Sequence, residues 1–317
     1  MHTRFRLGSW AVVLGLSLAV VGCGQYSYSK LKGKKLFRDA NALYQQQDYK
    51  RAADKYTEVL AADPDLVTAY FFLANSQDNL YKPSHAGEKE NDSYLQEAIK
   101  NYKTSAERET DPKMKKLALE YLVAAYGPDK LNDPSQSEPI VKQMIAMEPN
   151  EPTNYFALAK IYEDSGLYDE AEQTLLKARE VRPNDPTVYT TLAGYYNRQG
   201  EFDKTIEALE ERARREPENP EAFHTIATYY WDKCFRDFRL TDAQKKDYIS
   251  KGLTAEDKAI GLKADYMEAL TYKNLLLRLQ ANLEKDPKIQ KELLSEADKL
   301  RDRAMELQKK KTAGTQD

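Results

Sequence analysis

The sequence predicts an all-α fold in which helix hairpins stack on one another as a solenoid. Two complete copies of a 34-residue unit lie end to end between Pro152 and Pro220. Prolines recur at the same period, because Pro149, Pro183 and Pro217 are each 34 residues apart. The composition agrees with helix, since charged residues make up 31% of the chain and β-branched runs are scarce. A repeat of this length indicates a unit that buries its apolar face by stacking on its neighbours.

The two copies place the same residue types at the same positions, and each position has a structural reason. An aromatic residue, a leucine, an alanine and a tyrosine fall at i, i+3, i+4 and i+7, which puts them on one face of a first helix. A glycine then breaks that helix, small residues on a second helix allow close approach, and a proline ends the unit because it lacks an N–H. The first copy uses Tyr155, Leu158, Ala159, Tyr162, Gly166, Tyr168, Ala171, Leu175, Ala178 and Pro183. The second copy uses Tyr189, Leu192, Ala193, Tyr196, Gly200, Phe202, Thr205, Leu209 and Pro217.

This pattern resembles the tetratricopeptide repeat (TPR). The resemblance implies a right-handed superhelix of about six to seven repeats over residues 35–308, two of which carry insertions. It also implies that the first helix of each repeat lines a concave groove, in which a protein or peptide partner binds.

Three less regular repeats precede the two complete copies. The first closes at Pro64 and has its expected small and aromatic residues at Ala40, Tyr49, Ala52 and Tyr56. The second is interrupted at residues 81–92, which have loop composition. The core positions around this interruption are Tyr70, Leu73, Ala74, Ala98 and Tyr102. The third repeat has a degenerate middle, and its core positions are Tyr121, Ala124, Ala125, Val141 and Met144.

A sixth repeat and a final hairpin follow the two complete copies. The sixth repeat keeps its register at Phe223, Ile226, Ala227 and Tyr230. Its turn is replaced by residues 231–247, which we expect to form a loop unusually rich in aromatic side chains. The last hairpin has a highly charged outer face that suits a solubilising cap. Residues 309–317 form a polar tail.

The N-terminus predicts a lipoprotein signal peptide over residues 1–22. Two arginines make its start positive, and residues 7–21 form an apolar segment shorter than the roughly 20 residues of a membrane-spanning helix. The segment ends in VVGC, which is similar to the bacterial lipobox. This resemblance implies cleavage after Gly22 and attachment of acyl chains to Cys23. Several acyl chains on one residue anchor a protein stably in a membrane.

The alternative is an ordinary signal peptide whose cysteine is incidental. If Cys23 is lipidated, the glycine that follows it implies sorting to the outer membrane in a bacterium with two membranes. The protein is then expected in the cell envelope, facing the periplasm, with residues 23–34 as the lipidated cysteine and a polar tether. Cys234 would be the single remaining thiol, which excludes an intramolecular disulfide.

Several functional classes find no support in the sequence. A formal net charge of -3, with both signs interleaved, gives no electrostatic case for nucleic-acid binding. Because HExxH, CxxC, GxSxG, P-loop and GxGxxG motifs are absent, we expect neither an enzyme nor a cofactor. His85, Glu88 and Glu90 are candidate metal ligands, but in a charged loop we expect them to be solvated, and we predict no metal. The sequence leaves the oligomeric state open.

By the TPR resemblance, particular positions of each first helix face the groove. We expect partner contacts from Phe156, Lys160, Glu163, Asn197, Arg198, His224, Thr228 and Trp231. Aromatic side chains among polar ones suit a peptide with a few apolar anchors. The alternative is that Phe156 and Trp231 pack against neighbouring repeats. The groove positions lack the clustered Lys and Arg that clamp a terminal carboxylate in chaperone-binding TPR proteins.

Two functions are consistent with these features. The leading hypothesis is a lipid-anchored scaffold of the bacterial cell envelope that binds a protein or peptide partner and supports assembly of an envelope complex. The alternative is an envelope lipoprotein that binds a small ligand or glycan, with residues 231–238 as an aromatic lid.

Overall fold

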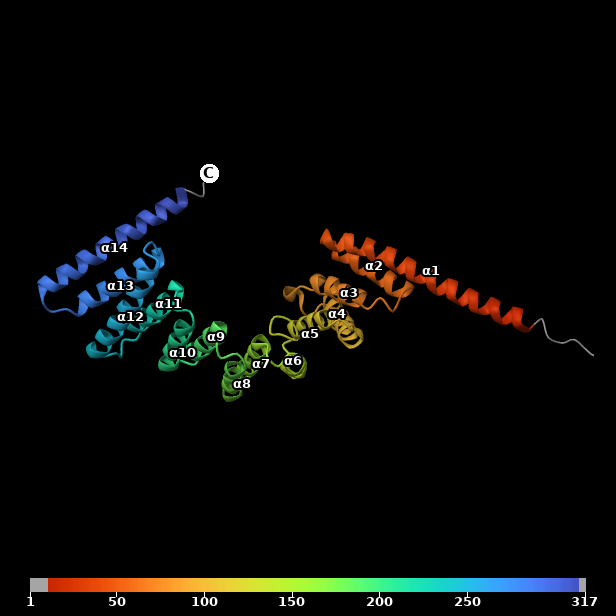
Figure 1. Cartoon of the computed structure of the whole chain (residues 1–317), viewed down its shortest axis with the longest axis horizontal. Helices are drawn as coiled ribbons and strands as arrows, with labels where there is room; N and C mark the ends of the chain where they lie inside the picture. The colour runs from red at the N-terminus through yellow and green to blue at the C-terminus, as the bar shows by residue number, and fades with distance from the viewer. Residues whose placement is uncertain (1–10, 314–317) are drawn as a thin grey trace, which may run out of the picture. The chain divides into compact units, whose positions relative to one another are not determined.

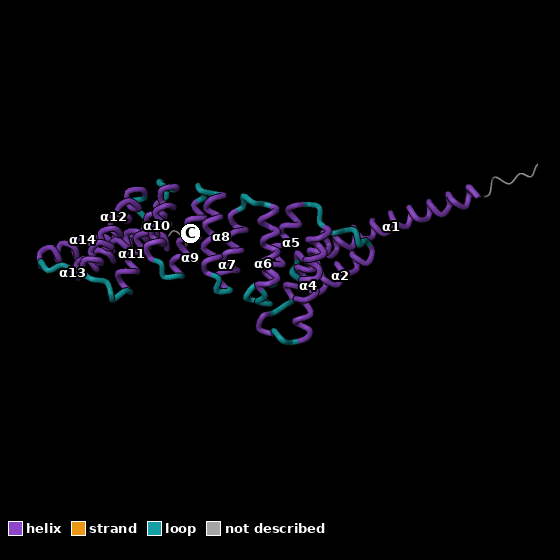
Figure 2. The backbone as a smooth tube through the Cα atoms, turned by 90° about the horizontal axis from the view of Figure 1, so that it is seen from below, coloured by secondary structure: helices purple, strands orange, loops and turns teal. Residues whose placement is uncertain are grey.

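The computed structural model describes the backbone of residues 11–313 and the side chains of residues 28–312. Over these residues the chain is all-α, with fourteen α-helices, one short 3-10 helix and no strand (Figures 1 and 2). Consecutive helices pack pairwise as hairpins. The predicted fold class, a TPR-like solenoid of helix hairpins, is therefore confirmed.

The chain divides into two compact units. Unit 1 comprises residues 1–149 and 164–166, and unit 2 comprises residues 150–163 and 167–317. The helices of unit 1 are α1 (Ala11–Gln45), α2 (Tyr49–Ala62), α3 (Thr68–Leu80), α4 (Lys89–Arg108), α5 (Pro112–Ala125) and α6 (Pro134–Met147). The helices of unit 2 are α7 (Pro152–Asp164), α8 (Tyr168–Val181), α9 (Pro186–Arg198), α10 (Phe202–Arg215), α11 (Pro220–Arg236), α12 (Asp242–Leu262), α13 (Met267–Leu283) and α14 (Pro287–Ala313).

Each unit buries residues that the repeat pattern places on the inner faces of its helices. In unit 1 the buried pattern residues include Ala40, Ala52, Tyr56, Leu73, Ala74, Ala98 and Tyr102. In unit 2 they include Tyr155, Leu158, Ala159, Ala171, Leu175, Ala178, Tyr189, Leu192, Ala193, Tyr196, Thr205 and Leu209. Alanine at the contact points lets paired helices approach closely, while leucine and tyrosine supply the apolar area that stabilises the stack.

A polar network crosses the core of unit 1. Tyr44 Oη donates to Asn75 Oδ1 at 2.6 Å, and Asn75 Nδ2 donates to Tyr102 Oη at 3.2 Å. Tyr102 Oη also lies 3.5 Å from Asp78 Oδ2, and Asp78 forms a salt bridge with Lys130. Burial raises the pKa of Tyr102, so its hydroxyl stays protonated and remains a donor. These hydrogen bonds offset the cost of placing polar groups in a packed core.

The first insertion is partly helical, which corrects the prediction of a loop over residues 81–92. The loop contains the 3-10 helix η1 (Pro83–His85) and ends where α4 begins at Lys89. Asn91 gives the physical reason, because its side chain accepts from the backbone N–H of Lys82 at 2.8 Å and donates to the Lys82 carbonyl at 3.1 Å. These two hydrogen bonds tie the first turn of α4 to the loop, so the last inserted residues extend the helix.

The second insertion is not the aromatic loop predicted for residues 231–247. Helix α11 continues to Arg236 and α12 begins at Asp242, which leaves a short connection. Trp231 and Phe235 lie one helical turn apart and stack with ring centroids 5.0 Å apart and planes inclined by 10°. This i, i+4 contact stabilises the helical conformation. Trp231 and Phe235 therefore belong to α11 and not to a loop.

Of the three core positions predicted on the first helix of the third repeat, Ala125 is buried and Tyr121 packs against the core, but Ala124 is not a core residue. Ala118, Leu119, Leu122 and Ala125 of α5 are buried, whereas Ala124 is exposed. The buried residues are spaced at i, i+1, i+4 and i+7, so they share one face of α5. Ala124 lies about 100° around the helix from Ala125, which turns its side chain to solvent.

The turns of three hairpins, α1–α2, α7–α8 and α9–α10, contain a residue with a left-handed backbone. The φ angle is 76° at Gly166 and 77° at Gly200, as the predicted turn glycines require. Gln47 occupies the equivalent position in the first hairpin, two residues before the second helix, and its φ angle is 60°. Side chains other than glycine adopt this conformation only at a cost.

We expect Gly200→Ala to lower the free energy of unfolding by about 1 kcal/mol, because an alanine there must keep a positive φ. No atom lies within 4 Å of a Cβ built at Gly200, so the cost is conformational and not steric. Gln47→Gly should have the opposite sign and raise the free energy of unfolding by about 0.5 kcal/mol. Urea unfolding followed by circular dichroism measures both. Destabilisation by both substitutions would contradict this account.

The N-terminal predictions fall largely outside the described residues. Residues 1–10 and the side chains of residues 11–27 are not described, so the signal peptide and the lipidation of Cys23 stay predictions. The predicted tether, residues 23–34, is helical within α1, and Gly33 is buried against Asp63. Among the described helices, none is both long and apolar enough to cross a membrane. The predicted polar tail begins inside α14, which continues to Ala313.

Candidate partner-binding surface

The residues predicted to contact a partner all lie on first helices of unit 2. Helix α7 carries Phe156, Lys160 and Glu163, α9 carries Asn197 and Arg198, and α11 carries His224, Thr228 and Trp231. The side chains of Lys160, Asn197 and Arg198 are exposed, and the other five are partly buried. Two pairs from this set are connected in the structure. Glu163 contacts Arg198 directly, and His224 and Trp231 both contact Tyr272.

Glu163 and Arg198 connect α7 to α9. Arg198 Nε donates to Glu163 Oε1 at 2.7 Å, and Arg198 Nη2 donates to Glu163 Oε2 at 2.9 Å. Two parallel hydrogen bonds make this a strong form of ion pair. The Glu163 side chain is 11% exposed, and the Arg198 guanidinium holds the pKa of that carboxyl below its usual range. These two predicted partner contacts thus also stabilise the contact between successive repeats.

We expect Glu163→Gln to lower the free energy of unfolding at pH 7 by about 1 kcal/mol, because the amide keeps the shape and loses the charge. The folded pKa of Glu163 lies below its ordinary value of 4.5. The stabilisation is therefore present above about pH 4.5 and is lost as the pH falls through the folded pKa. Urea unfolding at pH 7 and at pH 3 measures the difference.

Glu180→Gln is the matched control for this prediction. Glu180 pairs with Lys177 on the surface of α8 at 2.7 Å, and its side chain is 64% exposed. Such pairs contribute little to stability. Equal losses in the free energy of unfolding from the two substitutions at pH 7 would show that the Glu163–Arg198 ion pair stabilises the protein no more than an exposed surface pair.

His224, one of the predicted partner contacts, is largely buried in the structure. Its side chain is 12% exposed, and its Nδ1 lies 2.9 Å from Oε1 of Glu256 on α12. The Glu256 side chain is fully buried, and its Oε2 has no hydrogen-bond partner among the described residues. Burial raises the pKa of Glu256 to about 7. His224 is thus the structural partner of a buried carboxyl group.

Aromatic rings lead from this buried pair to the surface. The His224 ring contacts the rings of Tyr266 and Tyr272, each with centroids 5.2 Å apart. Tyr272 also meets Trp231 edge to face at 5.3 Å. Trp231 in turn stacks on Phe235. We call Trp231 and Phe235 the α11 aromatic pair.

The α11 aromatic pair is open to solvent on the side of Phe235. The Phe235 residue is 56% exposed, and Phe238, in the connection that follows α11, is 89% exposed. Exposed aromatic side chains are typical of interaction surfaces, where they become the anchors of the interface. Sequence reasoning placed the anchor at Trp231, whereas the structure exposes Phe235 and half-buries Trp231.

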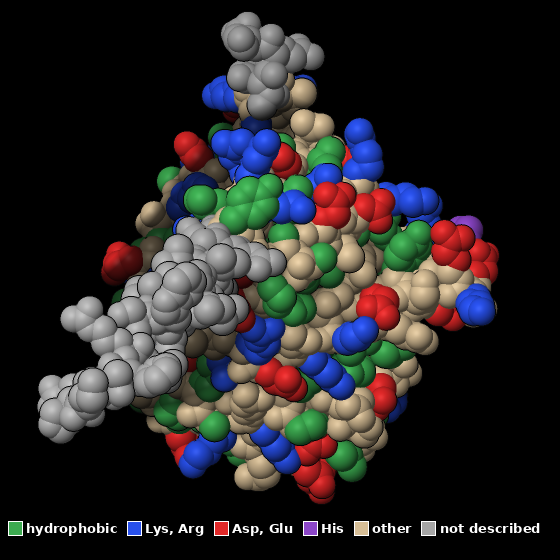
Figure 3. All heavy atoms as spheres, turned by 90° about the vertical axis from the view of Figure 1, so that its right-hand side faces the viewer, with side chains coloured by type: hydrophobic (Ala, Val, Ile, Leu, Met, Phe, Trp, Pro, Cys, Tyr) green, Lys and Arg blue, Asp and Glu red, His purple; other side chains and the backbone are tan. Residues whose placement is uncertain are grey.

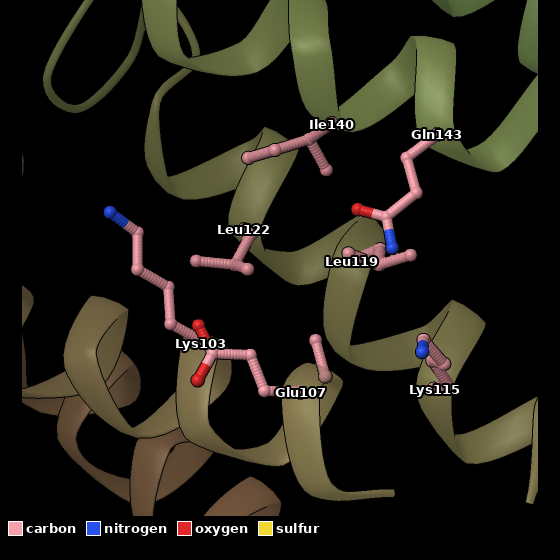
Figure 4. Close-up of a pocket in the computed structure, with 8 residues that line it drawn as sticks. Lys103, Glu107, Lys115, Leu119, Leu122, Ile140 and Gln143 are labelled. Carbon is pink, nitrogen blue, oxygen red and sulfur yellow. The ribbon is translucent and has the colours of Figure 1, made fainter. Parts of the chain in front are cut away.

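A cleft of about 410 Å³ lies between α4, α5 and α6 of unit 1 (Figure 4). Leu119, Leu122 and Ile140 line it, with Lys103 and Glu107 at its margin. Leu119 and Leu122 are only 3% and 2% exposed. Little apolar surface is therefore open to a ligand, and the cleft is a weaker candidate site than the α11 aromatic pair.

The described residues show no arrangement typical of a metal centre or a reactive thiol. None of their His, Cys, Asp and Glu side chains gather in groups of three or more that could hold a metal ion. His85 pairs with Glu88 at 2.9 Å, and both side chains are exposed. Burial raises the pKa of the Cys234 thiol to about 11, which disfavours the nucleophilic thiolate. Acidic and basic side chains are interleaved over the face shown in Figure 3.

Sequence reasoning missed Glu256, which resembles the many surface acids of this chain. One local signal was present, because Glu256 lies four residues after Gly252 and three before Ala259. Both small residues are buried, so this spacing places the carboxylate on the buried face of α12. Its partner His224 is 32 residues away, and no local pattern reveals that contact.

The tetratricopeptide repeat family matches the chain in two segments, residues 37–79 and residues 130–195. No curated protein matches the chain.

Solved structures are similar to the chain in fold at low sequence identity. The C-terminal part of a TPR repeat-containing protein from Cytophaga hutchinsonii is 16% identical, with a TM-score of 0.56 over 86% of this chain and 98% of that one. A tetratricopeptide repeat protein from Parabacteroides merdae is 15% identical, with a TM-score of 0.47 over 84% of this chain and 98% of that one. YrrB, a TPR protein with an unusual peptide-binding site, is 17% identical, with a TM-score of 0.38 over 70% of this chain and 98% of that one.

Proposed function

We propose that the chain, two segments of which match the tetratricopeptide repeat family, is a lipid-anchored scaffold of the bacterial cell envelope. Proteins built from these repeats are usually non-enzymatic scaffolds that bind protein or peptide partners. In this proposal the chain holds such a partner on unit 2 and supports the assembly of an envelope complex.

The α11 aromatic pair is the observation that carries the partner-binding part of the proposal. A ring that is 56% exposed in the free chain still has apolar area to bury against a partner. Trp231 holds Phe235 in place by stacking on it, so little side-chain freedom remains to be lost on binding. Rigid aromatic anchors of this kind supply much of the affinity of many protein interfaces.

Co-purification from detergent-solubilised membranes tests partner binding. We expect a specific protein to be recovered with the wild-type chain and to be reduced by tenfold or more with Phe235→Ser, about the effect of losing one aromatic anchor. Ile289→Ser is the control, because Ile289 is a similarly exposed apolar residue (44%) on α14. Recovery of no partner, or equal recovery with both variants, would count against binding through Phe235.

The lipid anchor is supported by the sequence around Cys23, where a small residue precedes the cysteine at the end of an apolar segment. The residue after it, Gly24, favours the outer membrane and a periplasmic location. We expect Cys23→Ser to move the chain from the membrane fraction to the soluble fraction, because no acyl chain can then be attached. A variant that stays tightly bound to membranes after a high-salt wash would contradict the anchor.

A further inference from the structure

We propose that the buried pair Glu256 and His224 makes the α11 aromatic pair sensitive to pH. Trp231 and Phe235 stay packed in their positions while the Glu256 carboxyl group is protonated. Their packing weakens when the carboxyl group loses its proton. This inference rests on the proposed function for its biological role, because it assigns regulation to the same surface. Its test does not require a partner.

A continuous chain of contacts connects Glu256 to the surface. Glu256 on α12 contacts His224 on α11, and the His224 ring meets Tyr272 on α13. Tyr272 supports Trp231 from the side, and Trp231 supports the exposed Phe235. Every link is a direct contact within unit 2. A change in the position of His224 therefore reaches Trp231 through one intervening ring.

The surroundings of Glu256 are poorly suited to a negative charge. Its Oε2 is buried and has no hydrogen-bond partner among the described residues. Its Oε1 is within hydrogen-bond distance of His224 Nδ1. A protonated carboxyl group carries no charge and can remain hydrogen-bonded to His224 Nδ1 in the buried site. A deprotonated carboxylate with an unpartnered oxygen gains free energy by reaching water. Such a movement separates α12 from α11 and withdraws His224 from Tyr272.

A neighbouring acidic group, Asp257, favours the protonated form of Glu256. Asp257 of α12 acts on Glu256 directly and is itself paired with Lys273 of α13 at 2.8 Å. The groups that act on Tyr266, on the far side of His224, are Glu221 of α11, Glu256 of α12, Glu268 of α13 and Arg212 of α10. The Asp257 charge therefore disfavours a negative charge on Glu256.

Tryptophan fluorescence tests the inference without a partner. The chain has two tryptophans, Trp10 and Trp231, so Trp10→Phe in the full-length chain leaves Trp231 as the only reporter. We expect acrylamide quenching of Trp231 to increase about twofold in one step as the pH rises from 5.5 to 8.5, because a half-buried ring becomes more exposed to solvent. The midpoint should lie near pH 7, where Glu256 titrates.

Two substitutions decide which group causes the step. Glu256→Gln keeps the shape of the side chain and removes the titrating proton, so we expect quenching that does not change with pH. Asp257→Asn should keep the step and lower its midpoint slightly, because the Asp257 charge raises the pKa of Glu256. A step that persists in Glu256→Gln would assign it to a group other than Glu256 and overturn the inference, as would the absence of a step in the wild type. Far-UV circular dichroism confirms that each variant remains helical.

Discussion

Tyr102→Ala is expected to lower the free energy of unfolding of unit 1 by about 3–5 kcal/mol, the usual cost of removing a fully buried aromatic ring. Tyr102 of α4 has no exposed surface. Its ring packs against Phe71 of α3 and Tyr121 of α5, with centroids 5.8 Å and 5.4 Å away. An alanine would leave a cavity between two hairpins, and the contact between these repeats would weaken.

Tyr102→Phe separates the ring from its hydroxyl. The ring contacts remain, while Asn75 Nδ2 loses its acceptor, so we expect a cost of about 1 kcal/mol. Urea unfolding gives the two free energies, and hydrogen exchange of the α4 amides shows whether the loss is local to unit 1. If the alanine variant loses no more stability than the phenylalanine variant, packing of the ring is not what stabilises these hairpins.

The free energy of unfolding of unit 2 is expected to fall by about 3 kcal/mol between pH 4.5 and pH 8, because of Glu256. The pKa of Glu256 is about 7 in the folded chain, above its ordinary value of 4.5. Between these values the folded chain holds a proton that the unfolded chain has released. The stabilisation is fully present below pH 4.5 and is lost as the pH rises through 7.

Glu256→Gln should remove this pH dependence. Its neutral amide fits the same space, so we expect it to unfold at a similar urea concentration at pH 5 and to be more stable than the wild type at pH 8. The titration of Glu163 lies below pH 4.5, outside this window, so the two effects can be measured separately. Parallel stability profiles for the wild type and Glu256→Gln would show that the buried carboxyl does not control stability in this range.

Part of the candidate surface could be predicted from the repeat register. The register identified α7, α9 and α11 as first helices, and it marked Trp231 as a possible anchor. It could not show that Phe235 is the exposed ring, because the prediction ended α11 near Trp231 and assigned the following residues to a loop. The i, i+4 spacing of these two rings was the overlooked signal for helix.

The sequence by itself determined which helical faces of the two complete repeats are buried and where their hairpin turns lie. The repeated positions of Tyr155 and Tyr189, of Leu158 and Leu192, and of Gly166 and Gly200 predict burial and turn conformation, which depend mainly on neighbours within one or two helical turns.

Only the tertiary structure decided which polar groups meet. Glu163 and Arg198 are 35 residues apart, and His224 and Glu256 are 32 apart, so both pairs depend on how separate helices pack. Helical periodicity says which face a side chain occupies, and it does not say which charge from another helix lies opposite. The insertions are different, because the Asn91 hydrogen bonds and the stacking of Trp231 on Phe235 are local contacts that extend helices beyond the boundaries that the repeat pattern predicts.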